Sequence, residues 1–166
     1  MNLRLLRLWL LVWVVSLTGC STPTLRPQAS STTTPAFWSG RLALNIDSTP
    51  PQNLSATFEL LGSDKEGQLL LLSPLGTSLG RLRWQPGFAQ LDQGEHHWQD
   101  SSVQALTERL TGTPLPLDAL FQWLQGNAQS AAGWQADLEQ LVSQRRLRAE
   151  RQNPAPAAQL KLQLDR

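Results

Sequence analysis

The stretch WSGRLALNI, residues 38–46, decides the fold class because apolar or small side chains alternate with polar ones along most of it. A period of two places successive side chains on opposite faces of a β-strand. Trp38 and Leu42 fall on one face, and Arg41 and Asn45 fall on the other. Residues 38–46 are therefore predicted to form a strand with one buried face.

The same pattern returns along the chain, and turn sequences separate the repeats. Residues 54–60 alternate in the same way, and residues 69–72 are four consecutive leucines. Between them, GSDKEG at residues 62–67 has the composition of a turn. Further short strands are predicted at residues 81–84, 88–92 and 96–98. Turn signals about every 8 to 12 residues indicate an antiparallel meander that curls into a sheet or barrel.

Two helices interrupt the predicted strands. Residues 103–110 and 117–124 carry leucines at helical spacing, so that each has one apolar face. Ser101 and Gln104 have the spacing of a capping box at the start of the first helix. Gly112 is placed to end that helix, because glycine is favoured just beyond a helix C-terminus.

The last third of the chain allows two interpretations. A set of apolar residues has helical spacing: Trp134, Leu138, Leu141 and Val142. Residues 147–149 and 160–164 instead alternate, and NPAP at residues 153–156 reads as a hairpin connection. We favour three closing strands.

The N-terminus is predicted to be removed or lipidated rather than folded. Residues 1–19 have the basic start and the short apolar run of a signal peptide. The apolar run is too short to span a bilayer, which takes about 20 apolar residues. LTGC at residues 17–20 resembles the lipobox of bacterial lipoproteins, in which Cys20 takes the lipid. Residues 20–35 are then a lipidated cysteine and a disordered tether rich in Ser, Thr and Pro. The folded domain is expected at residues 36–166.

Composition and motifs exclude several classes of protein. A net charge of +1 is unlike the basic excess of nucleic-acid-binding proteins, and one cysteine excludes an internal disulfide framework. His96 and His97 are adjacent, so in a strand they point to opposite faces and cannot bind one metal together. Catalytic and phosphate-binding motifs are absent from the sequence. We therefore expect no enzyme activity, cofactor, metal or nucleic-acid partner.

The aromatic composition is unusual, with seven Trp, no Tyr and four Phe. Large aromatic residues spread over nearly every predicted element fit either an ordinary core or a cavity for an acyl chain, since such sites are mostly apolar. The candidates for the cavity lining are Trp38, Leu42, Phe58, Leu71, Trp84, Trp98, Leu106, Leu110, Leu120, Trp123 and Trp134. Leu75 stands apart, because it lies between Pro74 and Gly76, where a loop tip would expose it.

Several motifs follow one another along the chain: the lipobox, FWSGRLAL at residues 37–44, LLLLSPLG at 69–76, LTGTPLPLDAL at 110–120, WLQG at 123–126, and Gly133 with Trp134. Together they resemble the LolB family of outer-membrane lipoprotein receptors. The resemblance implies a mainly β (α+β) fold, an unclosed antiparallel β-barrel whose short helices lid a hydrophobic cavity. The chain departs from the family pattern between residues 127 and 132, where a strand is missing, and it lacks the family's closing Trp near the C-terminus.

The resemblance also implies a function. A LolB protein takes lipoproteins from the periplasmic carrier LolA and inserts them into the outer membrane by acyl-chain transfer. Pro74, Leu75 and Gly76 match its membrane-insertion loop, and Cys20 would anchor a monomer to the periplasmic face of the outer membrane. Two other classes stay open from the residues alone: an assembly-factor lipoprotein that binds a protein at an apolar face, and a periplasmic lipid-modifying enzyme.

Overall fold

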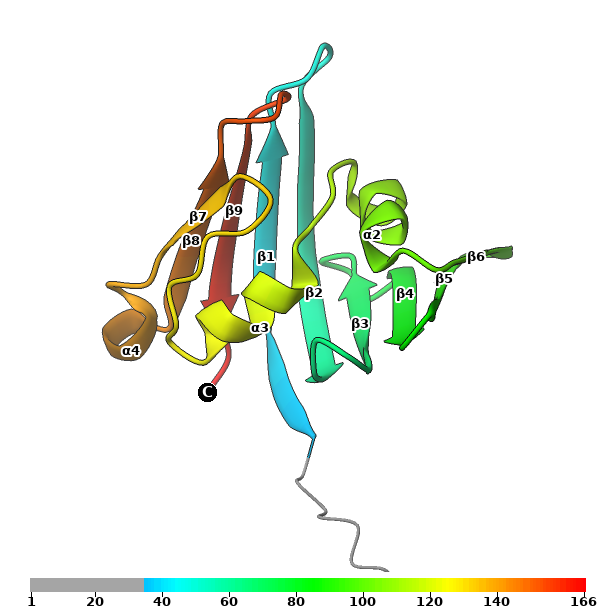
Figure 1. Ribbon diagram of the computed structural model, residues 1–166, viewed down its shortest axis with the longest axis horizontal. Coiled ribbons are helices and arrows are strands. Elements are labelled where there is room, and N and C mark those ends of the chain that lie inside the picture. Colours follow the sequence, from blue (N-terminus) through cyan, green and yellow to red (C-terminus); the bar gives the residue numbers. More distant parts are fainter. Residues whose placement is uncertain (1–34) are drawn as a thin grey trace, which may run out of the picture. The chain divides into compact units, whose positions relative to one another are not determined.

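The structure, a computed structural model, describes residues 35–166. The predicted signal peptide, Cys20 and nearly all of the predicted tether lie outside the described residues. Residues 34–166 form one compact unit, which consists of a curved sheet with helices on one face (Figure 1).

Nine strands form a single antiparallel sheet in the order β6-β5-β4-β3-β2-β1-β9-β8-β7. The strands are β1 (Ala36–Ile46), β2 (Gln52–Gly62), β3 (Gly67–Leu72), β4 (Ser78–Gln85), β5 (Phe88–Gln93), β6 (His96–Asp100), β7 (Trp134–Asp137), β8 (Arg146–Arg151) and β9 (Ala158–Leu164). The first six run as a meander, and the last three return to pair on the free side of β1. The edge strands β6 and β7 are not paired with each other, so the prediction of an unclosed antiparallel sheet is confirmed.

The period of two that predicted the strands also decides which face is buried. Along β1, Leu42 and Leu44 are buried while Arg41 and Asn45 are exposed. A glycine is needed where β1 meets β9, because a Cβ on Gly40 would lie 2.1 Å from the carbonyl oxygen of Gln163. The exposed and buried sets therefore form two continuous faces across the sheet.

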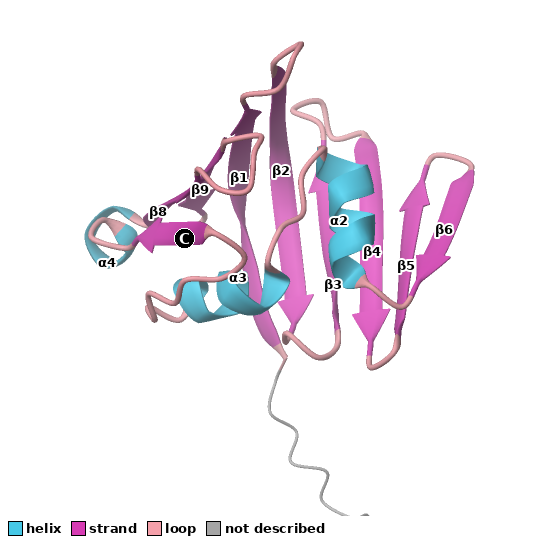
Figure 2. Ribbon diagram, turned by 45° about the horizontal axis from the view of Figure 1, so that its top comes forward, coloured by secondary structure: helices cyan, strands magenta, loops and turns pink. Residues whose placement is uncertain are grey.

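Helices α2 (Val103–Thr111) and α3 (Leu117–Leu124) lie over the buried face of the sheet (Figure 2). Gly112 caps α2 in a left-handed conformation, as predicted. The predicted capping box at Ser101 is wrong, because the side chain of Ser102 accepts the hydrogen bond from the Ala105 amide at 3.3 Å. No helix of residues 35–166 is long and apolar enough to cross a membrane.

The favoured interpretation of the C-terminal part, three closing strands, is confirmed by β7, β8 and β9. The helical spacing after Trp134 produces only a single turn, α4 (Leu141–Gln144). Val142 on that turn is 94% exposed, so it does not continue an apolar helix face. Strand pairing decides the outcome, since Trp134–Asp137 pairs with β8 residue by residue.

Candidate functional site

The loop between β3 and β4 is a tight, hydrogen-bonded turn that presents one leucine to solvent. The Ser73 amide donates to the Thr77 carbonyl at 2.7 Å, and the Gly76 amide donates to the Ser73 carbonyl at 2.8 Å. The Ser73 hydroxyl also accepts from the amides of Leu75 and Thr77, at 3.3 and 3.1 Å. These bonds fix the backbone around Leu75 while leaving its side chain free.

Leu75 is 95% exposed, and its neighbours Pro74 and Gly76 are exposed as well. Gly76 has a φ of +84°, a left-handed conformation that suits glycine and turns the chain back towards β4. The turn therefore carries an apolar side chain that is almost fully exposed and is suited to enter an apolar phase.

The predicted cavity residues lie between the sheet and the helices, where they pack against one another. Nine of them are buried: Leu42, Phe58, Leu71, Trp84, Leu106, Leu110, Leu120, Trp123 and Trp134. Trp38 is partly buried and packs against this cluster. The interior is thus a continuous apolar space that side chains fill.

Phe121 of α3 is the central contact between a helix and the sheet in this interior. Its ring lies 5.6 Å from that of Trp38 and 6.2 Å from that of Trp84, both in edge-to-face arrangement. Phe121 is only 2% exposed, and the sequence analysis did not include it among the cavity residues. Its position at i+4 from Leu117 on the apolar face of α3 is the signal that identifies it.

The two remaining interior tryptophans fix the loops on either side of α3. Trp123 donates from Nε1 to the Gln129 carbonyl at 2.6 Å, and Trp134 donates from Nε1 to the Pro114 carbonyl at 3.3 Å. Buried indole N–H groups need such acceptors, because an unpaired one is costly. Both indoles therefore tie loop backbone to the interior.

Trp98 packs against the same cluster from the edge strand β6. It is partly buried on β6 beneath the guanidinium of Arg109, whose Cζ is 4.9 Å from the ring centre. The His96 ring stacks on it at 5.5 Å. Trp98 therefore borders the cluster rather than lying inside it.

One charged side chain, Arg151 of β8, is buried on the inner face at 3% exposure. Its guanidinium lies 5.5 Å from the Trp134 ring centre and donates to the Pro156 carbonyl at 2.9 Å, while its Nε has no hydrogen-bond partner. Burial lowers the pKa of Arg151, and the negative charge of Glu108 opposes this shift. The sequence analysis missed this residue, although its inward position follows from the alternation along β8.

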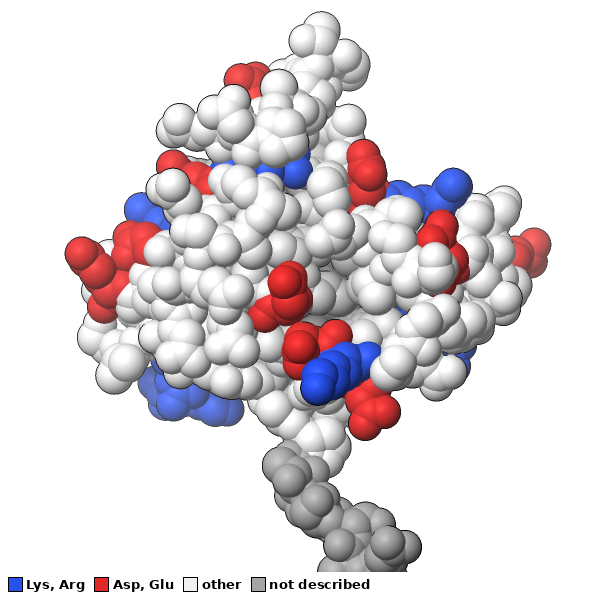
Figure 3. Space-filling model, viewed as in Figure 1, with Lys and Arg blue, Asp and Glu red and all other residues white. Residues whose placement is uncertain are grey.

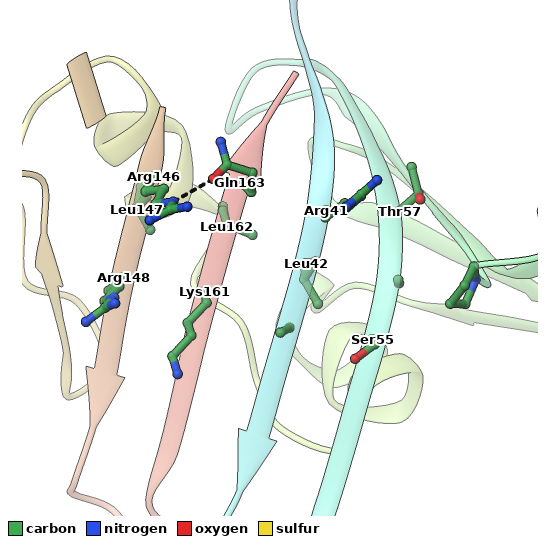
Figure 4. A pocket seen from close by; sticks show the side chains of 13 residues that line it. Arg41, Leu42, Ser55, Thr57, Arg146, Leu147, Arg148, Lys161, Leu162 and Gln163 are labelled. Carbon is green, nitrogen blue, oxygen red and sulfur yellow. Dashed lines mark hydrogen bonds between the residues drawn. The ribbon is translucent and has the colours of Figure 1, made fainter. Parts of the chain in front are cut away.

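On the opposite face of the sheet, a groove of about 640 Å³ crosses β2, β1, β9 and β8 (Figure 4). Four cations line it: Arg41, Arg146, Arg148 and Lys161. Pro74, from the loop that carries Leu75, lines it too. The helix-covered face differs, because its basic and acidic side chains are scattered over it rather than gathered into one basic patch (Figure 3).

This groove was not predictable from the pattern of any one strand. The alternation along each strand correctly predicts that each cation points outward. It does not predict which strands are neighbours, and β1 and β9 are more than a hundred residues apart in the chain. Only the register of the sheet shows that Arg41, Lys161 and Arg148 belong to one surface. Long-range strand pairing carries no local sequence signal.

Residues 35–166 contain no group of three or more His, Cys, Asp or Glu side chains placed to bind a metal ion. His97 bonds through Nδ1 to Asp92 at 2.7 Å, while His96 stacks on Trp98. The two histidines therefore have separate partners.

Comparison with known proteins gives a consistent result. The family model described as "Outer membrane lipoprotein LolB" matches residues 37–163. An "Outer-membrane lipoprotein LolB" of Chromobacterium violaceum is 32% identical over 124 residues, which cover 72% of this chain and 67% of that protein. One of Shewanella sediminis is 30% identical over 158 residues, which cover 90% of this chain and 68% of that protein. One of Yersinia pseudotuberculosis is 41% identical over 66 residues, covering 39% and 31%.

Proposed function

Because the chain belongs to the LolB family of outer-membrane lipoproteins, we propose that it receives lipoproteins from the periplasmic carrier LolA and inserts them into the outer membrane. The transfer moves acyl chains between apolar surfaces and needs no covalent step. The observation that carries the proposal is Leu75, which stands 95% exposed on a hydrogen-bonded turn.

The proposed anchor is Cys20, acylated after removal of residues 1–19. Each buried CH₂ of an acyl chain contributes about 0.8 kcal/mol, so several chains on one cysteine give a durable attachment. Residues 21–35 then act as a tether that keeps the domain at the periplasmic face of the outer membrane, as a monomer.

The proposed acyl site is the interior between the sheet and α3. In the structure its apolar side chains fill this space, so acyl chains enter by displacing Phe121 from its contacts with Trp38 and Trp84. Cargo contacts then replace side-chain contacts, and tens of Å² of additional apolar burial at about 25 cal/mol per Å² suffice to favour entry. The bilayer buries the chains more completely and therefore accepts them from this site.

Leu75 acts at the last step of the proposed transfer. The free energy falls when an exposed leucine moves from water into lipid. Because the turn is already fixed, no further backbone ordering is needed to hold Leu75 in position. It thus brings the domain into contact with the acyl region that the cargo must enter.

The proposal is tested in the native host, with full-length protein in both arms. Depletion of the protein is expected to leave lipoproteins bound to the periplasmic carrier. Leu75→Glu is expected to fold normally and to stall delivery in the same way. The matched control is Val142→Glu, which places the same charge at a site 94% exposed and far from the loop in the sequence.

Normal delivery by Leu75→Glu would contradict the proposed role of the loop, as would equal stalling by Val142→Glu. Normal delivery after depletion would contradict the receptor function as a whole. It would instead favour an assembly-factor lipoprotein that binds a protein partner at its apolar face.

A further inference from the structure

The groove on the outer face of the sheet concentrates positive charge that nothing in the domain neutralises. The chain has thirteen acidic residues, and none of them lines the groove. Arg41, Arg146, Arg148 and Lys161 are all exposed, and none lies within ion-pair distance of a carboxylate among residues 35–166. The nearest acidic side chain on β8, Glu150, is hydrogen-bonded to Gln159 at 2.7 Å instead.

Sheet register places two of the cations directly opposite each other. Arg148 of β8 pairs with Lys161 of β9, and like charges at such positions repel. In the next row, Arg146 and Arg41 flank Gln163, whose Oε1 accepts from Arg146 Nε at 2.8 Å. The repulsion between the rows is relieved when an anion binds between them, and the bond to Gln163 holds one guanidinium in place for it.

The position of the groove indicates which anion this is. Pro74 lines the groove, and the next residue is the exposed Leu75. A surface that combines cations with a protruding apolar side chain matches the headgroup region of a bilayer, where phosphates lie just outside the acyl chains. We propose that this basic groove binds the phosphate headgroups of anionic phospholipids in the membrane that Leu75 enters.

This inference rests on the proposed function in one respect, the contact of Leu75 with lipid. It adds a lipid-headgroup site on the face of the sheet opposite the helices, with an orientation: the groove faces the bilayer, and the helix-covered interior is left accessible to cargo. Because headgroup binding requires neither cargo nor carrier, it can fail while the proposed function holds.

The test uses the full lipidated chain anchored in vesicles of phosphatidylcholine, with or without phosphatidylglycerol. The chain has one cysteine, which the lipid occupies, so Asn53→Cys supplies a single thiol for a fluorophore on the outer face beside the groove. Headgroup spin-labelled lipid quenches this fluorophore when the groove faces the bilayer. Quenching is expected to rise with phosphatidylglycerol and to fall at about 1 M salt, where the screening length is about 3 Å.

Arg146→Gln combined with Arg148→Gln is expected to reduce the equilibrium constant for the phosphatidylglycerol-dependent contact about 25-fold, since each interfacial charge contributes about fivefold. The matched control, Lys65→Gln with Arg81→Gln, removes the same charge from exposed sites outside the groove and is expected to retain the contact.

Three outcomes would overturn the proposal. The first is equal quenching in vesicles with and without phosphatidylglycerol, and the second is an equal loss of quenching in the groove variant and the control. The third is a groove variant that no longer binds the carrier in the absence of vesicles but is quenched as strongly as the native chain. The last outcome would assign the groove to an acidic protein surface. Leu75→Glu separates the two proposals. If this variant loses cargo delivery but its quenching still rises with phosphatidylglycerol, headgroup binding is a property of the groove itself.

Discussion

Arg151 is a charged side chain held in an apolar interior with incomplete hydrogen bonding. Its guanidinium lies over the ring of its cross-strand partner Trp134, yet its Nε has no hydrogen-bond partner. Desolvation of a buried cation opposes folding, so a long apolar side chain in the same space stabilises the fold at least as well. The favourable contributions to set against this cost are a hydrogen bond to Pro156, the contact with the indole face and the attraction of the negative charge of Glu108.

We predict that Arg151→Met leaves the free energy of unfolding unchanged or raises it by up to about 2 kcal/mol. Arg151→Ala, which also removes the packing of the stem, should lower it by about 2 kcal/mol. Urea denaturation of the two variants measures the difference. A larger loss for Arg151→Met than for Arg151→Ala would mean that the guanidinium itself stabilises the interior.

Asp92 on β5 gives the domain a predictable response to acid. Hydrogen bonds from Gln90 and with His97, and a smaller effect of Arg83, lower the pKa of its carboxyl to about 2. A carboxyl whose pKa is lower in the folded state stabilises the fold above its unfolded pKa near 4, and this stabilisation is lost as the pH falls towards 2.

We predict that the native chain loses about 1 kcal/mol more stability than Asp92→Asn between pH 4.5 and pH 2. This loss is smaller than the free energy that corresponds to the full pKa shift, because solvent screens the interactions. The Asp92 side chain is 21% exposed and the Arg83 side chain is 50% exposed. Urea unfolding of both proteins at the two pH values gives the comparison, and other carboxyls contribute equally to both. Parallel losses would show that the cluster has no effect on folding.

At the scale of elements, buried side-chain hydrogen bonds fix the segment between α2 and α3, and the hydroxyl of Thr107 makes one of them. Thr107 Oγ1 donates to the Gln104 carbonyl at 2.8 Å and accepts from the Leu115 amide at 3.0 Å. Thr107 is 0% exposed and Leu115 is 2% exposed, so water cannot replace either partner. The connection to α3 therefore depends on this side chain.

Thr107→Val keeps the shape of the side chain but leaves the Leu115 amide unpaired. We predict a loss of about 1 to 3 kcal/mol in stability, and faster hydrogen exchange at Leu115 before global unfolding. Thr57→Val, on the solvent face of β2, is the control and should change stability by less than about 0.5 kcal/mol. Unchanged protection at Leu115 would contradict the assigned role.

The elements themselves were largely predictable, because most strands that cover the interior alternate over their own length, the leucine run of β3 being an exception. Residues 38–46 show this best, since local pattern alone separates Leu42 from Arg41. The segment after Trp134 was ambiguous, because its apolar spacing fits a helix and only pairing with β8 makes it a strand. The basic groove was not predictable, since it depends on which distant strands become neighbours.

At the scale of the whole molecule, the interior is filled rather than hollow. Phe121 contributes most directly, because its ring bridges Trp38 on β1 and Trp84 on β4. The same residues that were predicted to surround an acyl chain therefore also form the core of the domain. Stability and the proposed cargo binding then draw on the same contacts, and we expect them to change in opposite directions.

We predict that Phe121→Ala lowers the free energy of unfolding by about 3 to 5 kcal/mol and strengthens binding of a fluorescent fatty acid. The space that the ring leaves is apolar and accepts the probe without displacing a side chain. Phe37→Ala is the control, because Phe37 is 57% exposed and its loss should affect neither measurement. Weaker probe binding by Phe121→Ala would place the acyl site outside this interior.

The open sheet has a mechanical consequence. In a closed barrel, strand number and shear set the internal diameter, so the barrel dilates only by breaking a strand pairing. Here β6 and β7 are free edges, and helices rather than hydrogen-bonded strands cover the interior. The domain can change its internal cross-section by shifting α3 alone, with every backbone ladder intact. We therefore expect the proposed acyl site to adjust its capacity while the pairing of the strands is kept.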